Sequence, residues 1–253
     1  MRGAIRALVL AAGVLAAAGV VVWSQPHWLL DAIAERYPGC AYRFRTDLPA
    51  IALTIDDGPD RETPLILEEL RRHSAQATFF PLASRAGDHD AVMERIVREG
   101  HEIGNHGLYD RAAVRLPIGE FARDLAAAGS TLARFGPVRW ARPGSGWYTQ
   151  GMIAAMRRAG NRCALGSVYP FDAAIPSVRI ARGHVLANVR PGSIVVLHDG
   201  GTRGRRTLEV LRRVLPELRR RGYRVVTLSE LAALATGRDA VQRNVPGLTS
   251  YTR

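Results

Sequence analysis

Two adjacent carboxylates stand out in the run LTIDDGPD, residues 53–60, where Asp56 and Asp57 directly follow a short apolar segment. Two like charges this close repel each other, so a half-buried pair needs a cation or a basic side chain beside it if both are to stay ionised. A solvated turn is the alternative, because Asp, Gly and Pro are common turn residues. The other polar residues of the chain must decide between a turn and a site.

Four later predicted strands are each followed by residues that could do chemistry. His106 and Asp110 are four residues apart, which brings two side chains to one face of a helical turn and suits a metal ion. A local helix cap by Asp110 is the alternative. Arg142 precedes a Pro-Gly-Ser-Gly loop with free backbone N–H groups. Asp172 follows the next strand, and His198 ends the most apolar strand of the chain.

These strands alternate with helices along the chain, a pattern that predicts parallel strands with helices outside, in either a doubly wound sheet or a barrel. No Gly-x-Gly-x-x-Gly follows the first strand, so a dinucleotide-binding fold gains no support. Barrels build active sites at the carboxyl ends of their strands, where the polar residues lie here. We therefore predict one α/β domain, a barrel of about seven strands, over residues 45–237. The predicted strands are 50–55, 77–83, 101–106, 138–143, 163–168, 192–198 and 223–228.

Helices are predicted at 28–36, 63–73, 90–100, 118–136, 150–160, 177–189, 206–222 and 229–236. Thr63 is the expected N-cap of the second, with Pro64 at its first position. In the helix at 206–222 four leucines share one face and arginines lie opposite, which indicates a buried face and a solvated one. These leucines are Leu208, Leu211, Leu215 and Leu218.

The N-terminus has the pattern of an export signal. Arg2 and Arg6 precede an uncharged apolar run at residues 7–23, which indicates a secretory signal or a signal anchor over residues 1–24. A small-residue cleavage site is present at 16–18, but the apolar run continues past it and favours an uncleaved anchor. In either case the domain is exported, to the periplasmic or extracellular face of the membrane or as a secreted protein. Residues 25–44 are predicted as a linker and 238–253 as a tail.

Charge and cysteine content narrow the partners. The net charge of +12 comes from arginine alone, because the chain has no lysine. Basicity permits nucleic acid, anionic lipid or an acidic polymer, but no compact basic stripe appears and an exported protein does not meet nucleic acid. We therefore expect no nucleic-acid partner. Cys40 and Cys163 either form a disulfide or remain two inert thiols.

The five polar segments, in this order, resemble the motifs of the polysaccharide deacetylase family, carbohydrate esterase family 4, which has the NodB homology domain. Its Thr-Phe-Asp-Asp-Gly-Pro motif reads TIDDGP at 54–59, and its His-Ser/Thr-x-x-His/Asp motif reads HGLYD at 106–110. Its Arg-x-Pro-Tyr-Gly motif corresponds loosely to RPGSG at 142–146. Asp172 matches the fourth motif and IVVLH at 194–198 the fifth. The resemblance covers roughly residues 50–235 and implies a distorted (β/α) barrel of the NodB type.

The resemblance implies that Asp57, His106 and Asp110 hold one divalent metal ion, which would neutralise Asp57 and lower the pKa of a bound water. Asp110 stands where histidine is more common in the family. Two carboxylates and one imidazole form a harder ligand set, so zinc, manganese, cobalt and iron are all candidate metals.

The resemblance also assigns the catalytic roles. Asp56 would act as general base, oriented by Arg142, and His198 would protonate the departing sugar amine with Asp172 as its partner. The implied reaction removes N-acetyl groups from an amino-sugar polysaccharide or oligosaccharide of the cell envelope.

Three residues of the third motif and its flank are implied in oxyanion and substrate binding. The backbone N–H of Ser145 would stabilise the oxyanion. Trp147 and Tyr148 could supply aromatic surface to the substrate, although packing is the alternative for at least one of them. Gly107 and Ala173 depart from the family pattern and indicate altered specificity.

Two other functions compete with this one. A membrane-anchored deacetylase-like protein could bind carbohydrate without turnover, but binding alone does not need Asp56, Arg142 and His198. A phosphoesterase often uses two metal ions, and this chain supplies ligands for one.

Among the remaining histidines, His101 is expected to point away from the site and His184 to lie on the surface.

Overall fold

Eight short parallel strands form the centre of the protein in a computed structural model that describes residues 12–14, 16 and 18–237. Each strand except the first overlaps a predicted one and extends at most one residue beyond it, although most are shorter than predicted; the first was not predicted. Their bounds are β1 Cys40–Ala41, β2 Ala50–Asp56, β3 Ala77–Phe80, β4 Glu102–Ile103, β5 Trp140–Ala141, β6 Arg162–Ala164, β7 Ile194–His198 and β8 Arg224–Val226.

The strands form two parallel sheets that join into a distorted barrel. One sheet has the order β4-β3-β2-β7, with β8 paired to the first half of β2, and the other has the order β1-β6-β5. Isolated bridges connect them, since Asn105 pairs with Ala141 and Val168 pairs with Val195. The predicted (β/α) barrel of the NodB type is therefore confirmed.

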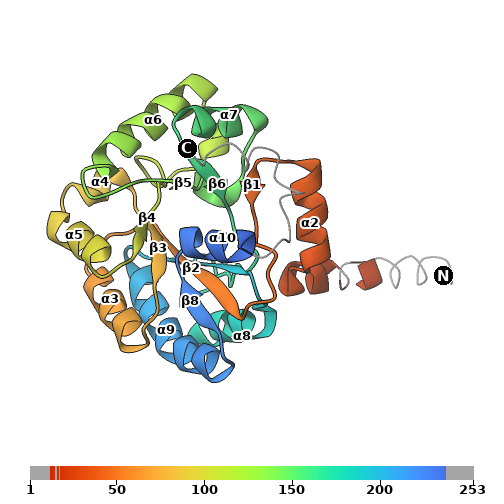
Figure 1. Cartoon of the computed structure of the whole chain (residues 1–253). Helices are drawn as coiled ribbons and strands as arrows, with labels where there is room; N and C mark the ends of the chain where they lie inside the picture. Colours follow the sequence, from red (N-terminus) through yellow and green to blue (C-terminus); the bar gives the residue numbers. More distant parts are fainter. Residues whose placement is uncertain (1–11, 15, 17, 238–253) are drawn as a thin grey trace.

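The helices surround the strands (Figure 1). Their order along the chain follows the predicted alternation, with one short additional helix after β3 and short 3₁₀ turns before α6 and α7. Their bounds are α2 His27–Arg36, α3 Thr63–Arg72, α4 Ala83–Ala86, α5 Asp90–Arg98, η1 Ala113–Arg115, α6 Ile118–Leu132, η2 Gly144–Gly146, α7 Gln150–Arg158, α8 Val178–Asn188, α9 Thr202–Arg220 and α10 Leu228–Thr236.

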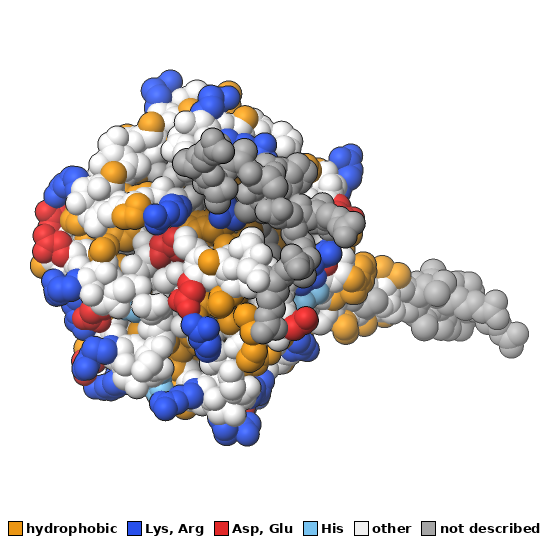
Figure 2. Space-filling view, viewed as in Figure 1, with side chains coloured by type: hydrophobic (Ala, Val, Ile, Leu, Met, Phe, Trp, Pro, Cys, Tyr) orange, Lys and Arg blue, Asp and Glu red, His pale blue; other side chains and the backbone are white. Residues whose placement is uncertain are grey.

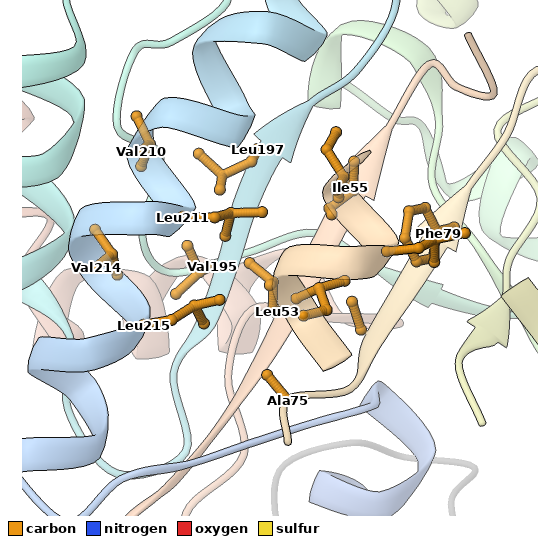
Figure 3. Close-up of a cluster of buried hydrophobic side chains, with 14 of the residues drawn as sticks. Leu53, Ile55, Ala75, Phe79, Val195, Leu197, Val210, Leu211, Val214 and Leu215 are labelled. Carbon is orange, nitrogen blue, oxygen red and sulfur yellow. The ribbon is translucent and has the colours of Figure 1, made fainter. Parts of the chain in front are cut away.

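The main core lies between the central strands and α9. All seven residues of β2 are buried, as expected of a strand covered on both faces. Figure 3 shows side chains of β2 and β7 facing those of α9, among them Leu53, Val195 and Leu211. The four leucines predicted to share one face of α9 are all buried, so that prediction is confirmed. Arginine side chains are scattered around the visible rim of the molecule (Figure 2).

The segment at 25–44, predicted as a linker with a short helix, also contributes to the sheet. Its strand β1 pairs with β6, with Cys40 opposite Cys163. These two cysteines form a disulfide across 123 residues of chain, at a Cα–Cα distance of 4.5 Å. A disulfide stabilises mainly by restricting the unfolded chain, typically by about 2–4 kcal/mol. The alternative of two free thiols is therefore excluded.

Two local predictions were wrong. Thr63 is the first residue of α3 and Glu62 is the N-cap, because the Thr63 hydroxyl donates to the buried carboxylate of Asp199 instead of capping its own helix. His184 is fully buried rather than on the surface. It is buried because two rings pack edge-on against it, that of Phe171 in the preceding loop and that of Trp23, which is far away in sequence.

The predicted signal or anchor lies partly outside the described residues, which omit 1–11, 15 and 17, and the predicted tail 238–253 lies wholly outside them. Residues 18–24 are helical and lead into α2 at the edge of the domain beside β1 (Figure 1). Among the described residues no single helix has the length and apolarity needed to cross a membrane. The pair Ala12–Ser24 and α2, bent by 86°, meets those criteria together, on length and composition alone.

Candidate active site

Asp56 and His198 lie side by side at the carboxyl ends of β2 and β7. They are register partners in the parallel pairing of these strands. Register partners on adjacent strands are separated by one interstrand spacing, about 4.8 Å. Asp56 is buried and the His198 side chain is 20% exposed. The sheet therefore places one carboxylate and one imidazole at the same height, with the imidazole nearer to solvent.

The Asp56 carboxylate is paired with Arg142, which follows β5. Arg142 Nη1 lies 2.6 Å from Asp56 Oδ1, and both side chains are almost completely buried. The guanidinium also donates to Thr54 Oγ1 and to the backbone oxygens of Ala164 and Leu165, at 2.8–3.0 Å. A planar guanidinium held by four such bonds has a fixed position. Arg142 therefore fixes Asp56 and balances its charge without blocking its second oxygen.

The His198 imidazole is paired with Asp172. Its Nδ1 lies 3.1 Å from both carboxylate oxygens, and the backbone N–H of His198 donates to Asp172 Oδ2 at 2.9 Å. Burial alone would lower the pKa of His198, but the hydrogen bond and charge of Asp172, with Asp56 and Asp57 nearby, raise it to about 9. His198 is therefore protonated at neutral pH, with Nε2–H available as a donor.

Asp57 is directed away from Asp56 by the backbone. Its φ of 71° is left-handed, which ends the strand and separates the two adjacent carboxylates. Asp57 Oδ1 lies 3.3 Å from His106 Nε2, and Oδ2 lies 2.9 Å from Arg203 Nη1. Burial alone would raise the pKa of Asp57, but His106 and Arg203 lower it. Each carboxylate of the pair thus has its own cationic partner, which answers the problem that the sequence posed.

Asp57 and His106 fit a divalent cation. His106 Nδ1 lies 2.8 Å from the backbone oxygen of Arg142, so Nδ1–H donates there and Nε2 faces Asp57. Burial alone would lower the pKa of His106, but the charges of Asp56 and Asp57 raise it. The same negative charges would favour a bound metal cation. A buried carboxylate and a correctly oriented imidazole are suitable donors for zinc and for related divalent metals.

Asp110, the third predicted ligand, is held apart from this pair. Its side chain is 56% exposed, and it contacts Arg203 Nη2 at 3.1 Å. The Arg203 guanidinium, from the first turn of α9, thus bridges Asp57 and Asp110. Among the described residues no three His, Cys, Asp or Glu side chains lie close enough together to hold a metal. Asp110 can complete the predicted set only if Arg203 releases the two carboxylates.

The three residues predicted for oxyanion and substrate binding differ in their surroundings. Ser145 sits in η2 with a left-handed φ of 68°, at the tip of the loop that follows Arg142. Trp147 is 69% exposed. The Tyr148 hydroxyl is 3.1 Å from that of Tyr42 and donates to the Tyr37 backbone at 2.7 Å, so its hydroxyl is used in packing against the N-terminal segment.

Sequence reasoning missed several residues that complete the site. Thr54 connects Arg142 to the Val195 backbone, and Arg203 bridges buried Asp57 and exposed Asp110. The Thr207 hydroxyl donates to the His198 backbone oxygen at 2.7 Å. Thr54 is the first residue of the first motif and could have been noticed as a hydroxyl in an apolar strand. Arg203 and Thr207 lie on α9, where no sequence pattern distinguishes them from the other polar residues of that helix.

Comparison with known proteins decides the family. The polysaccharide deacetylase family model matches residues 45–164. A peptidoglycan-N-acetylglucosamine deacetylase of Bacillus cereus is 36% identical over 186 residues, covering 72% of this chain and 87% of that protein. The chain belongs to the polysaccharide deacetylase family. A second family member, a chitooligosaccharide deacetylase of Azorhizobium caulinodans, is 35% identical over 206 residues, covering 73% of this chain and 95% of that protein.

Solved structures of the polysaccharide deacetylase family share the fold. A family 4 acetyl xylan esterase of Clostridium thermocellum, in complex with cobalt, superposes with a TM-score of 0.67 at 27% identity, covering 73% of this chain and 91% of that one. A mutant of a Bacillus anthracis pseudoenzyme, with restored enzymatic activity, has a TM-score of 0.71 at 26% identity, covering 78% and 72%. The family therefore includes both enzymes and a protein that has lost activity.

Proposed function

We propose that this protein is a metal-dependent polysaccharide N-deacetylase that removes N-acetyl groups from an amino-sugar polymer or oligomer of the cell envelope. One observation carries the proposal. A buried carboxylate held by Arg142 and a protonated imidazole held by Asp172 lie side by side at paired strand ends. Base and acid in this arrangement are what amide hydrolysis requires.

Asp56 serves as general base in this proposal. Its free oxygen accepts the proton of the attacking water, while Arg142 holds the other oxygen and keeps the carboxylate in place. The amide carbon gains the water oxygen, and the backbone N–H of Ser145 stabilises the oxyanion. His198 then donates its Nε2 proton to the leaving sugar nitrogen, so that acetate and a free amine are formed.

The proposed metal ligands are Asp57 and His106, with Asp110 as the third. A bound divalent ion, whether zinc, manganese, cobalt or iron, would polarise the acyl oxygen and acidify water. Exposed Trp147 offers an aromatic face on which a sugar ring can stack. The named activities of the two relatives, on peptidoglycan and on chitooligosaccharides, support an N-acetylated substrate.

The proposal is tested by measuring acetate release from peptidoglycan, chitooligosaccharides and a secreted amino-sugar polysaccharide. We expect release from at least one, loss of release with a chelator, and recovery on adding a divalent metal. Carbohydrate binding without acetate release from any of them would instead support the inactive, carbohydrate-binding alternative. The retained Asp56, Arg142 and His198 argue against that alternative, because binding alone does not require them.

The proposed location is the outer face of a membrane, with residues 1–24 as an uncleaved anchor. Valines of the helical segment before α2 are exposed, with Val14, Val20 and Val22 each at least 59% exposed. Figure 2 shows hydrophobic side chains on this projecting segment. Membrane fractionation and N-terminal sequencing test the anchor, and a mature N-terminus just after Ala18 would show a secreted protein instead.

Replacing Asp172 with asparagine is expected to move the alkaline limb of the pH profile. The raised pKa of His198, about 9, depends on the charge of Asp172. The acid is lost as the pH rises through this value, so removing the charge lowers the pH at which activity falls. We expect the limb to move down by about one unit or more. An Asp172→Asn profile identical to that of the wild type would remove this role from Asp172.

Replacing Arg203 with alanine is expected to tighten metal binding by about five- to tenfold, because a partly exposed ion pair of about 1 kcal/mol no longer competes for the carboxylates. Titration with cobalt or zinc measures the affinity directly. The matched control is Arg205→Ala, which removes an exposed arginine two positions along the same helix.

In Asp110→Ala metal binding should be lost. If its affinity equals that of the wild type, Asp110 is not a ligand.

A further inference from the structure

The chain just before α2 is bonded to the loop that carries Asp172. Gln25 Nε2 donates to the backbone oxygen of Tyr169 at 3.0 Å, and the backbone N–H of Tyr169 donates to Gln25 Oε1 at 2.7 Å. One amide side chain therefore satisfies both backbone groups of a residue 144 positions away. A pair of parallel bonds of this kind fixes orientation as well as distance.

Aromatic contacts extend the same attachment. The Trp23 ring stacks on Phe171, with centroids 6.2 Å apart and planes 18° from parallel. His184, from α8, packs edge-on against both rings at 5.0–5.1 Å. Burial lowers the pKa of His184, so it serves here as a neutral ring. Asn188 of the same helix donates to the Trp23 backbone oxygen at 3.1 Å.

The attached loop, residues 169–172, has a backbone that requires support. Phe171 has a φ of 59°, a left-handed conformation that a bulky side chain adopts only where the surroundings enforce it. The next residue is Asp172, which holds the ring and the backbone N–H of His198. At the other end, the charges of Arg142 and Asp56 act on the buried phenol of Tyr169. The loop thus bonds directly to His198 and lies within electrostatic range of Asp56 and Arg142.

We propose that Trp23 and Gln25 form a clamp that positions the Asp172 loop, and with it the proton donor His198. They are positioning residues, because they act through the loop and not on the substrate. The helical segment before α2 is then part of the enzyme and not only its tether. The inference rests on the proposed deacetylase function for its effect on rate, but the clamp itself is a property of the fold.

The clamp can be removed without detaching the N-terminal segment. Helix α2 is held independently, since Asp31 accepts from Arg43 at 2.5–2.9 Å and from Arg45 at 3.1 Å, and β1 is fixed by the disulfide. Gln25→Ala and Trp23→Ala therefore leave the domain and its N-terminal helix in place. Trp23→Phe keeps a ring to stack on Phe171 and serves as the conservative variant.

Acetate release by the full chain tests the effect on rate. We expect Gln25→Ala and Trp23→Ala to lower kcat by about tenfold, with KM within about twofold, because the proton donor is displaced and the substrate surface is not. Trp23→Phe should restore most of kcat. The controls are Gln150→Ala, which removes another glutamine bonded to a backbone oxygen, and Trp28→Ala, which removes a 67% exposed tryptophan.

Hydrogen exchange of peptides covering residues 169–175 tests the clamp without relying on catalysis. Faster exchange confined to these residues in Gln25→Ala, with the rest of the domain unchanged, is the expected result. Unchanged exchange would overturn the clamp even if the wild type releases acetate. Faster exchange with unchanged kcat, or equal losses of kcat in the two controls, would overturn its role in positioning. If the wild type releases no acetate from any substrate, the proposed function fails, while the exchange result still decides the clamp.

Discussion

Asp56→Asn is expected to abolish acetate release, with a loss on the order of 10³-fold or more, and to leave metal content near that of the wild type. The asparagine amide cannot accept the proton of the attacking water, and Asp56 is not among the proposed metal ligands. Its shape preserves the site, because Arg142 keeps its bonds to Thr54 and to two backbone oxygens. Acetate release and metal analysis of the same purified sample make the two measurements.

A loss of stability must be separated from a loss of chemistry in this variant. Removing one charge of a buried pair leaves Arg142 without its counterion, which typically costs about 3–5 kcal/mol. Thermal unfolding of Asp56→Asn therefore accompanies the assay, at a temperature where the variant is folded. Asp47→Asn removes an exposed carboxylate just before β2 and is the matched control. Substantial acetate release by folded Asp56→Asn would show that another group is the base.

His198→Ala is expected to lower kcat by on the order of 10²–10⁴, the usual contribution of a general acid, again without loss of metal. The strand end should survive, because Asp172 still accepts from the backbone N–H of residue 198. The alkaline limb that reflects a pKa of about 9 should also disappear from the pH profile. His73→Ala, at the C-terminal end of α3, is the control for losing an imidazole.

The leaving group sharpens this test. The leaving group of an aryl acetate is a weakly basic phenolate, which departs without a proton. The leaving group of the N-acetyl substrate is a sugar amine, which must be protonated to depart. His198→Ala should therefore lose far more activity toward the N-acetyl substrate than toward the aryl ester. Equal losses on both substrates would show that His198 orients the acyl group or shapes the site and does not supply the proton.

The sequence predicts an α/β domain from its alternating pattern, and its strand-end motifs predict the barrel and where the chemistry lies. Its apolar runs alternate with amphipathic helices, a pattern that favours parallel strands. The carboxyl ends of parallel strands lie on one edge, so Asp56 and His198 meet although 142 positions separate them. The five motifs mark these ends, and the pairing of β2 with β7 brings the two residues into register. Local patterns sufficed for the seven predicted strands, because each of these has a recognisable apolar run of its own.

The partner of each charged or aromatic side chain is seen only in the folded domain. No periodicity in the sequence indicates that Arg203 bridges Asp57 and Asp110, or that His184 is enclosed by Trp23 and Phe171. Strand β1 lies in a segment predicted as a linker and is recognised by its pairing with β6. These contacts join segments that are far apart in the chain. Their existence depends on the packing of the whole domain, whereas a sequence pattern reports only the few residues around it.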